Sequence, residues 1–173
     1  MIPSFIIHAS QSHDRDSLVK TLCHETNAEV VEAILLDNRL LGCCLSHLKV
    51  AHLAREQYPT LPYLVLEDDC VLHPGWREGV WDLSGEIVYL GFNDKHSTGV
   101  LFGTHAMLIS PNARDYLIKH LEQKIRSASV PAYDWLCWQL WIEGQFEVGY
   151  PDEGNHYCEQ KKGLQSLITG NIR

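Results

Sequence analysis

The chain has 173 residues and a mass of 19.7 kDa, and its 14 basic and 22 acidic residues give a formal net charge of −8. This length predicts a single domain over residues 1–173. The apolar fraction of 45% suits a packed core rather than general disorder. Nucleic-acid phosphates require a positive surface, and the sequence has no cluster of Lys and Arg. We therefore expect no nucleic-acid partner.

Hydropathy and cysteine usage indicate the compartment. No apolar run approaches the roughly 20 residues of a transmembrane helix, and the N-terminal residues lack the basic flank of a signal peptide. The six cysteines contain no CxxC pair, which argues against a structural zinc site. We therefore expect a cytoplasmic protein with reduced thiols, most of them small core side chains. The adjacent Cys43 and Cys44 should face different directions on a helix.

The N-terminal half alternates between strand-like and helix-like periodicity. Residues 3–8 form a short apolar run, which predicts a strand. A helix is expected over residues 14–25, with Asp14 as its N-cap. β-Branched and apolar residues predict a second strand over residues 29–36. Leucines at helical spacing predict a second helix over residues 42–57.

The C-terminal half continues this alternation. Apolar runs predict strands covered on both faces, as in a parallel sheet, at residues 62–69 and 86–90. Residues 100–110 hold one long or two short strands. The remaining expected elements are helices at 111–123 and 131–143 and a strand at 146–150, before a polar, irregular segment that begins at Pro151. This order predicts a three-layer α/β/α domain with a mostly parallel central sheet.

Three consecutive carboxylates, Glu67, Asp68 and Asp69, follow the apolar run at 62–66. Open α/β sheets bind their ligands at this edge. Because side chains alternate along a strand, Glu67 and Asp69 should share one face. Such carboxylates need a nearby cation, and the only basic groups near in sequence are His73 and Arg77. A hard divalent metal fits three oxygen donors; the alternative is a solvated turn after the strand.

The segment 41–69 resembles glycosyltransferase family 25, the lipooligosaccharide galactosyltransferases and their collagen-modifying relatives. The family pattern is a Gly-Cys-x-x-Ser-His helix followed by an apolar strand that ends in Glu-Asp-Asp. In this chain the pattern is formed by Gly42, Cys43, Ser46 and His47, then Glu67, Asp68 and Asp69. Weaker matches are Arg15, Gly103-Thr104-His105-Ala106, Ile109-Ser110, Ala113, Asp134 and Gln165-Ser166.

The resemblance implies a GT-A fold and the inverting transfer of a hexose from a nucleotide-diphosphate sugar to a glycan or lipid-linked saccharide. Uridine diphosphate-galactose or -glucose is the donor that it favours. Mn²⁺ or Mg²⁺, held by Asp69 with Glu67 or Asp68 behind it, would stabilise the departing diphosphate. The resemblance also suggests His156 as a further metal ligand; the alternative is a surface histidine.

Other site residues are expected from their places along the chain. The resemblance assigns the general base to Asp134, which otherwise is a carboxylate favoured by the dipole of its helix. His8 ends the first expected strand and Arg15 follows in the polar loop, which should meet the donor base or ribose. Ser46 and His47 either support the acidic segment and donor phosphates or only pack the helix. Gly103, Thr104 and His105 are expected to line the sugar pocket. The alternative is that Gly103 only introduces a kink into a strand.

Two other functions remain open at this point. One is a metal-dependent phosphohydrolase or nucleotidyltransferase that uses the same carboxylates, although such enzymes gather further acidic ligands for a second metal. The other is a non-catalytic module that binds a nucleotide-sugar without turnover.

Overall fold

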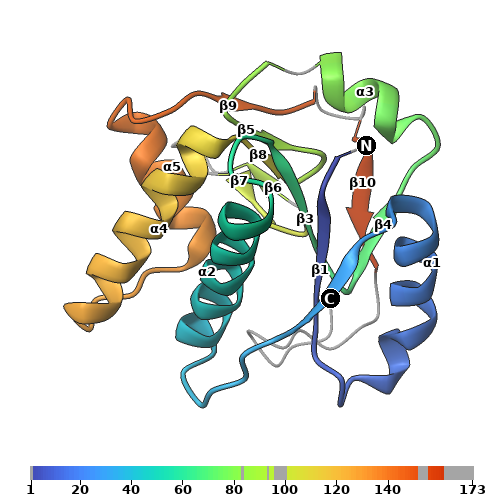
Figure 1. The fold of residues 1–173 in the computed structure, drawn as a ribbon, viewed down its shortest axis with the longest axis horizontal. Coiled ribbons are helices and arrows are strands. Elements are labelled where there is room, and N and C mark those ends of the chain that lie inside the picture. The colour runs from blue at the N-terminus through green and yellow to red at the C-terminus, as the bar shows by residue number, and fades with distance from the viewer. Residues whose placement is uncertain (1, 83, 93, 96–100, 152–155, 162–173) are drawn as a thin grey trace.

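The computed structural model describes residues 2–82, 84–92, 94–95, 101–151 and 156–161 (Figure 1). Its centre is a six-stranded sheet with the order β2-β1-β3-β8-β5-β9. In that order the strands are Glu29–Glu32, Ser4–His8, Tyr63–Glu67, Ala106–Ile109, Ile87–Tyr89 and Val148–Gly149. β8 runs antiparallel to its neighbours β3 and β5, and the other pairings are parallel.

Helices cover both faces of this sheet (Figure 1). One face packs against α2 (Arg39–Gln57), α4 (Pro111–Arg126) and α5 (Tyr133–Ile142). The other face packs against α1 (Asp16–Thr26), α3 (Trp76–Asp82) and a two-stranded sheet of β4 (Cys70–Leu72) and β10 (Cys158–Gln160). The remaining short elements are η1 (His13–Arg15), β6 (Asp94–Lys95) and β7 (Leu101–Phe102). The expected three-layer α/β fold with a mostly parallel sheet is confirmed. Among the described residues, no helix has the length and hydropathy needed to cross a membrane.

β3 lies between the two cores. Its side chains alternate, so that Tyr63 and Val65 join the core under α2, α4 and α5, whereas Leu64 and Leu66 join the core on the α1 side. Burial on both faces explains why this strand reads as a continuous apolar run. The parallel pairing of β1 and β3 sets Ile7 opposite Glu67. The carboxyl ends of the two strands therefore meet at one edge.

The N-terminal elements differ from the expectation in their bounds. Asp14 is not the N-cap of the first helix, because it lies inside η1 and α1 begins only at Asp16. β2 ends at Glu32, four residues earlier than expected. α2 begins at Arg39, three residues earlier than expected, because the side chain of Asn38 caps it by accepting the N–H of Leu41 at 3.1 Å.

The C-terminal elements follow the expectation more unevenly. Residues 100–110 hold two short strands, β7 and β8, rather than one. Four of the described elements were missed: β4, α3, β6 and β10. β10 lies in the segment expected to be irregular. Its three residues are too few to produce a periodicity, and it exists as a strand because it pairs with β4.

α2 packs unusually close to the segment that follows β2. A Cβ atom on Gly42 would lie 2.5 Å from the carbonyl oxygen of Ile34, which is closer than two such atoms can approach. Ser46 fixes the same contact, because its hydroxyl accepts the N–H of Ile34 and donates to the carbonyl of Gly42, both at 2.8 Å. The missing side chain of Gly42 therefore sets how deeply α2 sits against the chain.

We predict that Gly42→Ala destabilises the fold by about 1–2 kcal/mol. The overpacking cost of about 1–3 kcal/mol exceeds the gain in helix propensity, which is at most about 1 kcal/mol. The measurement is urea unfolding of both proteins. The matched control is Cys43→Ala, one residue further along α2, which should change the free energy of unfolding by less than about 1 kcal/mol. A more stable Gly42→Ala variant would contradict the close contact.

Candidate functional site

A pocket opens at the carboxyl ends of β1 and β3, beside the start of α2. One wall is apolar and is formed by Ile7 and the segment after β2, residues 33–36. The other wall is polar and is lined by Arg15, Arg39, Cys43, Ser46, His47, Glu67, Asp68, Asp69 and Gln160. All three acidic residues predicted from the sequence therefore reach one pocket, at the sheet edge where α/β folds bind ligands.

Asp68 is held by two basic side chains from the N-terminal part of the chain. Its Oδ1 forms an ion pair with Arg15, and its Oδ2 lies 2.9 Å from Nδ1 of His8. All three side chains are buried. Arg15 lies in η1 and His8 ends β1, so the turn after the first strand supplies the positive charge that the acidic segment requires. The expected contact of His8 and Arg15 with a donor stays a prediction, although Arg15 also lines the pocket.

Glu67 is stabilised in its charged form. Its Oε1 accepts the hydroxyl of Thr104 at 2.6 Å and lies 3.4 Å from Nε2 of His47. Burial raises the pKa of Glu67, but His47 and Thr104 outweigh this effect and lower the pKa to about 2. The ring of His47 is itself fixed, because it stacks on Tyr133 with the ring centroids 4.0 Å apart. Glu67 is therefore a carboxylate at any physiological pH.

Asp69 has the opposite environment. Its Oδ2 accepts the side-chain amide of Gln160 at 2.7 Å and lies 3.7 Å from Nη1 of Arg15. Its Oδ1 is buried and has no hydrogen-bond partner among the described residues. Burial and the negative charge of Glu67 raise the pKa of Asp69 to about 6, although Gln160 and Arg15 act against the rise. An unpartnered buried carboxylate oxygen fits a ligand of Mn²⁺ or Mg²⁺, both of which prefer oxygen donors.

Asp134 lies in the first turn of α5 and is partly buried. Its Oδ1 accepts the N–H of Trp135 at 2.9 Å. Burial raises the pKa of Asp134, and the charge of Glu67 adds to the rise. The backbone N–H of Gly103 acts against the rise, so Asp134 lies beside the segment that contacts Glu67 through Thr104. A carboxylate with a raised pKa is better suited to accept a proton near neutral pH than an ordinary aspartate.

The segment between β7 and β8 closes the centre from another side. Gly103 has a φ of 111°, a conformation that favours glycine. Thr104 contacts Glu67, as described above, and the carbonyl of His105 accepts the N–H of Glu67 at 2.9 Å. The ring of His105 is buried, and its contact with Cys158 outweighs the effect of burial and raises the pKa of His105. The structure therefore brings the predicted Gly103–Thr104–His105 segment to Glu67, and its contact with a sugar stays a prediction.

Two other predicted residues have different surroundings. Ser46 is buried and uses its hydroxyl on Gly42 and Ile34, so it positions the pocket wall. The ring of His156 lies 4.4 Å from that of Phe92. His156 lies four residues before Gln160, and four residues of fully extended chain span roughly 13 Å. Its role as a metal ligand stays a prediction. The weak match at Gln165-Ser166 lies outside the described residues.

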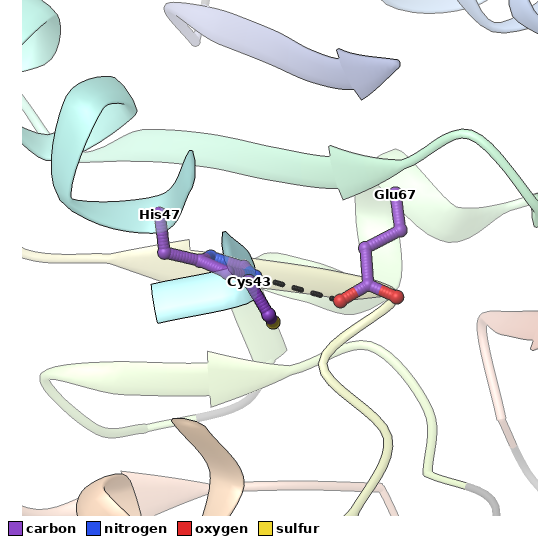
Figure 2. Close-up of side chains that lie close together, drawn as sticks. All are labelled: Cys43, His47 and Glu67. Atoms are coloured by element: carbon purple, nitrogen blue, oxygen red, sulfur yellow. Dashed lines mark hydrogen bonds and ion pairs between the residues drawn. The ribbon is translucent and has the colours of Figure 1, made fainter. Parts of the chain in front are cut away.

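A cluster with metal-binding donors lies beside these carboxylates. One donor atom each from Cys43, His47 and Glu67 lies within 4.8 Å of the other two, and Figure 2 shows the three side chains pointing toward one another. Sequence analysis missed Cys43 and also Gln160. The four-residue spacing of Cys43 and His47 was visible as one helix face, but its proximity to Glu67 depends on the fold.

Comparison with known proteins supports the fold. None of the known protein families matches the chain by sequence, and neither does any curated protein. A glycosyltransferase involved in the glycosylation of the major capsid of PBCV-1 is similar in structure, with 11% identity and a TM-score of 0.46 over 71% of this chain and 66% of that chain. The apo-form glycosyltransferase GlyE of Streptococcus pneumoniae TIGR4 has 10% identity and a TM-score of 0.51 over 86% of this chain and 45% of that chain.

The chain therefore spans less than two thirds of either neighbour. Its likeness to GlyE shows a shared α/β fold. Membership of family 25 stays a resemblance.

We predict that Asp69→Asn stabilises the metal-free protein at neutral pH. Because the pKa of Asp69 is 3.8 unfolded and about 6 folded, the unfolded state loses this proton first as pH rises from about 4 to about 6, and stability falls. The full loss is on the order of 3 kcal/mol. The variant, which never carries this charge, should gain roughly 1–3 kcal/mol above about pH 6.

The measurement is urea unfolding between about pH 4 and pH 8 with EDTA present, a range that contains the titration described above. The matched control is Asp37→Asn, since Asp37 is exposed; it should change stability by less than about 0.5 kcal/mol. If Asp69→Asn is less stable than the parent above about pH 6, the protein already compensates the charge of Asp69 and the prediction is wrong.

Proposed function

We propose that this chain is a metal-dependent glycosyltransferase. It would move a hexose from a nucleotide-diphosphate sugar to a hydroxyl of a glycan or lipid-linked saccharide, with inversion at the anomeric carbon. The observation that carries the proposal is the buried Oδ1 of Asp69, which no described residue partners and which lies next to the ionised Glu67, within a pocket at the carboxyl edge of the sheet. In this proposal residues 1–173 act as one catalytic domain in the cytoplasm.

Binding of a diphosphate needs positive charge that the protein lacks overall, since its net charge is −8. Asp69 and Glu67 would hold Mn²⁺ or Mg²⁺, which would stabilise the charge that develops on the departing diphosphate. Asp68 is better suited to a positioning role, because Arg15 and His8 already occupy its two oxygens. His156 remains a candidate for a further ligand.

The apolar wall of the pocket is suited to the flat face of a nucleotide base. Ile7 and residues 33–36 form this wall, and the exposed Arg39 lies at its rim. Arg39 is a cation within the pocket lining and would contact the ribose or a phosphate, a role that sequence analysis did not assign to it. Uridine diphosphate is the favoured nucleotide, on the basis of the family resemblance alone.

Asp134 would act as the general base. As the acceptor oxygen forms its bond to the anomeric carbon, the proton of that hydroxyl passes to the Asp134 carboxylate and the diphosphate leaves with the bonding electrons. The raised pKa of Asp134 supports this role. Thr104 and His105, which contact Glu67, would line the hexose site together with Gly103, between the donor and the base.

The first test is nucleotide binding, measured by thermal shift. Uridine diphosphate with Mn²⁺ should stabilise the protein by about 2.7 kcal/mol at 100 times the dissociation constant, which is roughly 5–10 °C for a chain of this length. Either component alone should have little effect. The Asp69→Asn variant should lose the combined shift while remaining folded. The absence of a shift with every nucleoside diphosphate, with Mn²⁺ or Mg²⁺, would refute the proposal.

A second prediction concerns the reaction step. Asp134→Asn should lower the rate of hexose transfer by about 10²–10⁴-fold and leave nucleotide affinity within about twofold, because Asp134 acts on the acceptor rather than the donor. Product analysis with a panel of saccharide acceptors measures transfer. The control is Glu143→Gln at the other end of the same helix. Phosphate release without sugar transfer would instead favour a phosphohydrolase, and nucleotide binding without turnover would favour a binding module.

A further inference from the structure

Two consecutive elements, α2 and β3, bring a thiol, an imidazole and a carboxylate together. Cys43 and His47 are four residues apart and share one face of α2, and Glu67 ends β3. One donor atom of each lies within 4.8 Å of the other two (Figure 2). Among the described residues, this is the group in which three His, Cys, Asp or Glu side chains bring their donor atoms this close to one another.

The distances agree with tetrahedral coordination. Nε2 of His47 and Oε1 of Glu67 are 3.4 Å apart. Nitrogen and oxygen ligands at about 2.0–2.1 Å from one tetrahedral zinc ion are about 3.3 Å apart, so this pair already has the required separation. A sulfur ligand at about 2.3 Å lies about 3.6 Å from either, so Cys43 needs a movement of about 1 Å. Rotation about its side-chain bond suffices for such a movement.

The donor types select a particular ion. A thiolate is a soft ligand that favours Zn²⁺, whereas Mg²⁺ and Mn²⁺ prefer oxygen. On binding, the neutral thiol of Cys43 releases its proton to solvent and a sulfur–zinc bond forms. One thiolate, one carboxylate and a neutral imidazole then balance the two positive charges of the ion. The bound centre is neutral, which suits its partly buried position.

The surroundings favour the same conclusion. The Thr104 hydroxyl donates to Glu67 at 2.6 Å and so orients the carboxylate from behind. Stacking on Tyr133 fixes the plane of the His47 ring. All three donor residues line the pocket, so water has access to an ion bound between them and would complete its coordination. A search for CxxC pairs could not find this arrangement, because only one of its three ligands is a cysteine.

We infer that Cys43, His47 and Glu67 form a site for Zn²⁺, distinct in its donor set from the oxygen site at Asp69. The inference does not rest on glycosyl transfer. One consequence does: an ion at this site would withdraw Glu67 from the Mn²⁺ and diphosphate, so Zn²⁺ would act as an inhibitor of nucleotide binding.

Co²⁺, which replaces Zn²⁺ and reports thiolate ligation, provides the test. Titration of the metal-free protein with Co²⁺ should give the near-ultraviolet thiolate-to-cobalt charge-transfer band and saturate at one ion per chain. Zn²⁺ should abolish the band by displacement. Cys43→Ala should remove the band and weaken Zn²⁺ binding, measured against a chelator, by about 100-fold or more, since loss of even an outer partner costs about 10–100-fold.

Matched variants keep the result interpretable. Cys43 is only partly buried, so its variant should fold, which circular dichroism checks; Cys43→Ser provides a second substitution of similar size. Cys23→Ser removes a partly buried thiol from α1, in the opposite layer, and should leave the band and the affinity within about twofold. A band that is absent in the parent, or that persists in both Cys43 variants, overturns the inference. Nucleotide binding without Zn²⁺ is scored separately, so either proposal can fail alone.

Discussion

The structure depends on the neutralisation of three consecutive carboxylates at the end of a strand that is buried on both faces. Removal of an ionised carboxylate from water costs several kcal/mol unless a partner compensates it. Arg15 is that partner: it is buried, pairs with Asp68 and also approaches Asp69. It can reach them because β1 and β3 are parallel neighbours, so the turn after β1 and the acidic segment after β3 share one edge.

The compensation is unequal, and this inequality gives the site its chemical character. Asp68 has partners for both oxygens, and Glu67 has donors that lower its pKa to about 2. Asp69 keeps a buried oxygen that has no hydrogen-bond partner in the described part of the chain, and its pKa is raised to about 6. A fold selected for stability alone would remove this charge. Local conflict of this kind is expected where a site awaits a ligand, because the ligand supplies the missing interaction.

The sequence predicted what depends on local pattern. The apolar run before Glu67 and the leucine spacing of α2 were sufficient to find both elements, and the edge position of the carboxylates followed from them. The partner of Asp68 was beyond such reasoning, because Arg15 is 53 residues away in sequence and the nearer His73 and Arg77 were considered instead. The contact between Arg15 and Asp68 forms because β1 and β3 are neighbours in the sheet, and this neighbourhood cannot be read from residues that are far apart in sequence.

The same limit applies to the C-terminal part of the site. β10 has three residues, two of them polar, and forms only through its pairing with β4. Without that pairing nothing in the sequence indicates that Gln160 would reach Asp69. Short strands of this kind carry almost no periodic signal, so their contribution to a site becomes visible only when the neighbouring strand is placed.

α2 links the shape of the pocket to its chemistry. Gly42 lets the helix approach the backbone of Ile34, and Ser46 fixes that approach on the side of the pocket wall. One turn of the same helix carries Cys43 and His47 toward Glu67. The close contact between Gly42 and Ile34 therefore sets how far Cys43 and His47 lie from Glu67, although neither Gly42 nor Ile34 is a donor. A bulkier residue at position 42 would move α2 outward and separate His47 from Glu67, so the glycine acts on the site through the position of the helix.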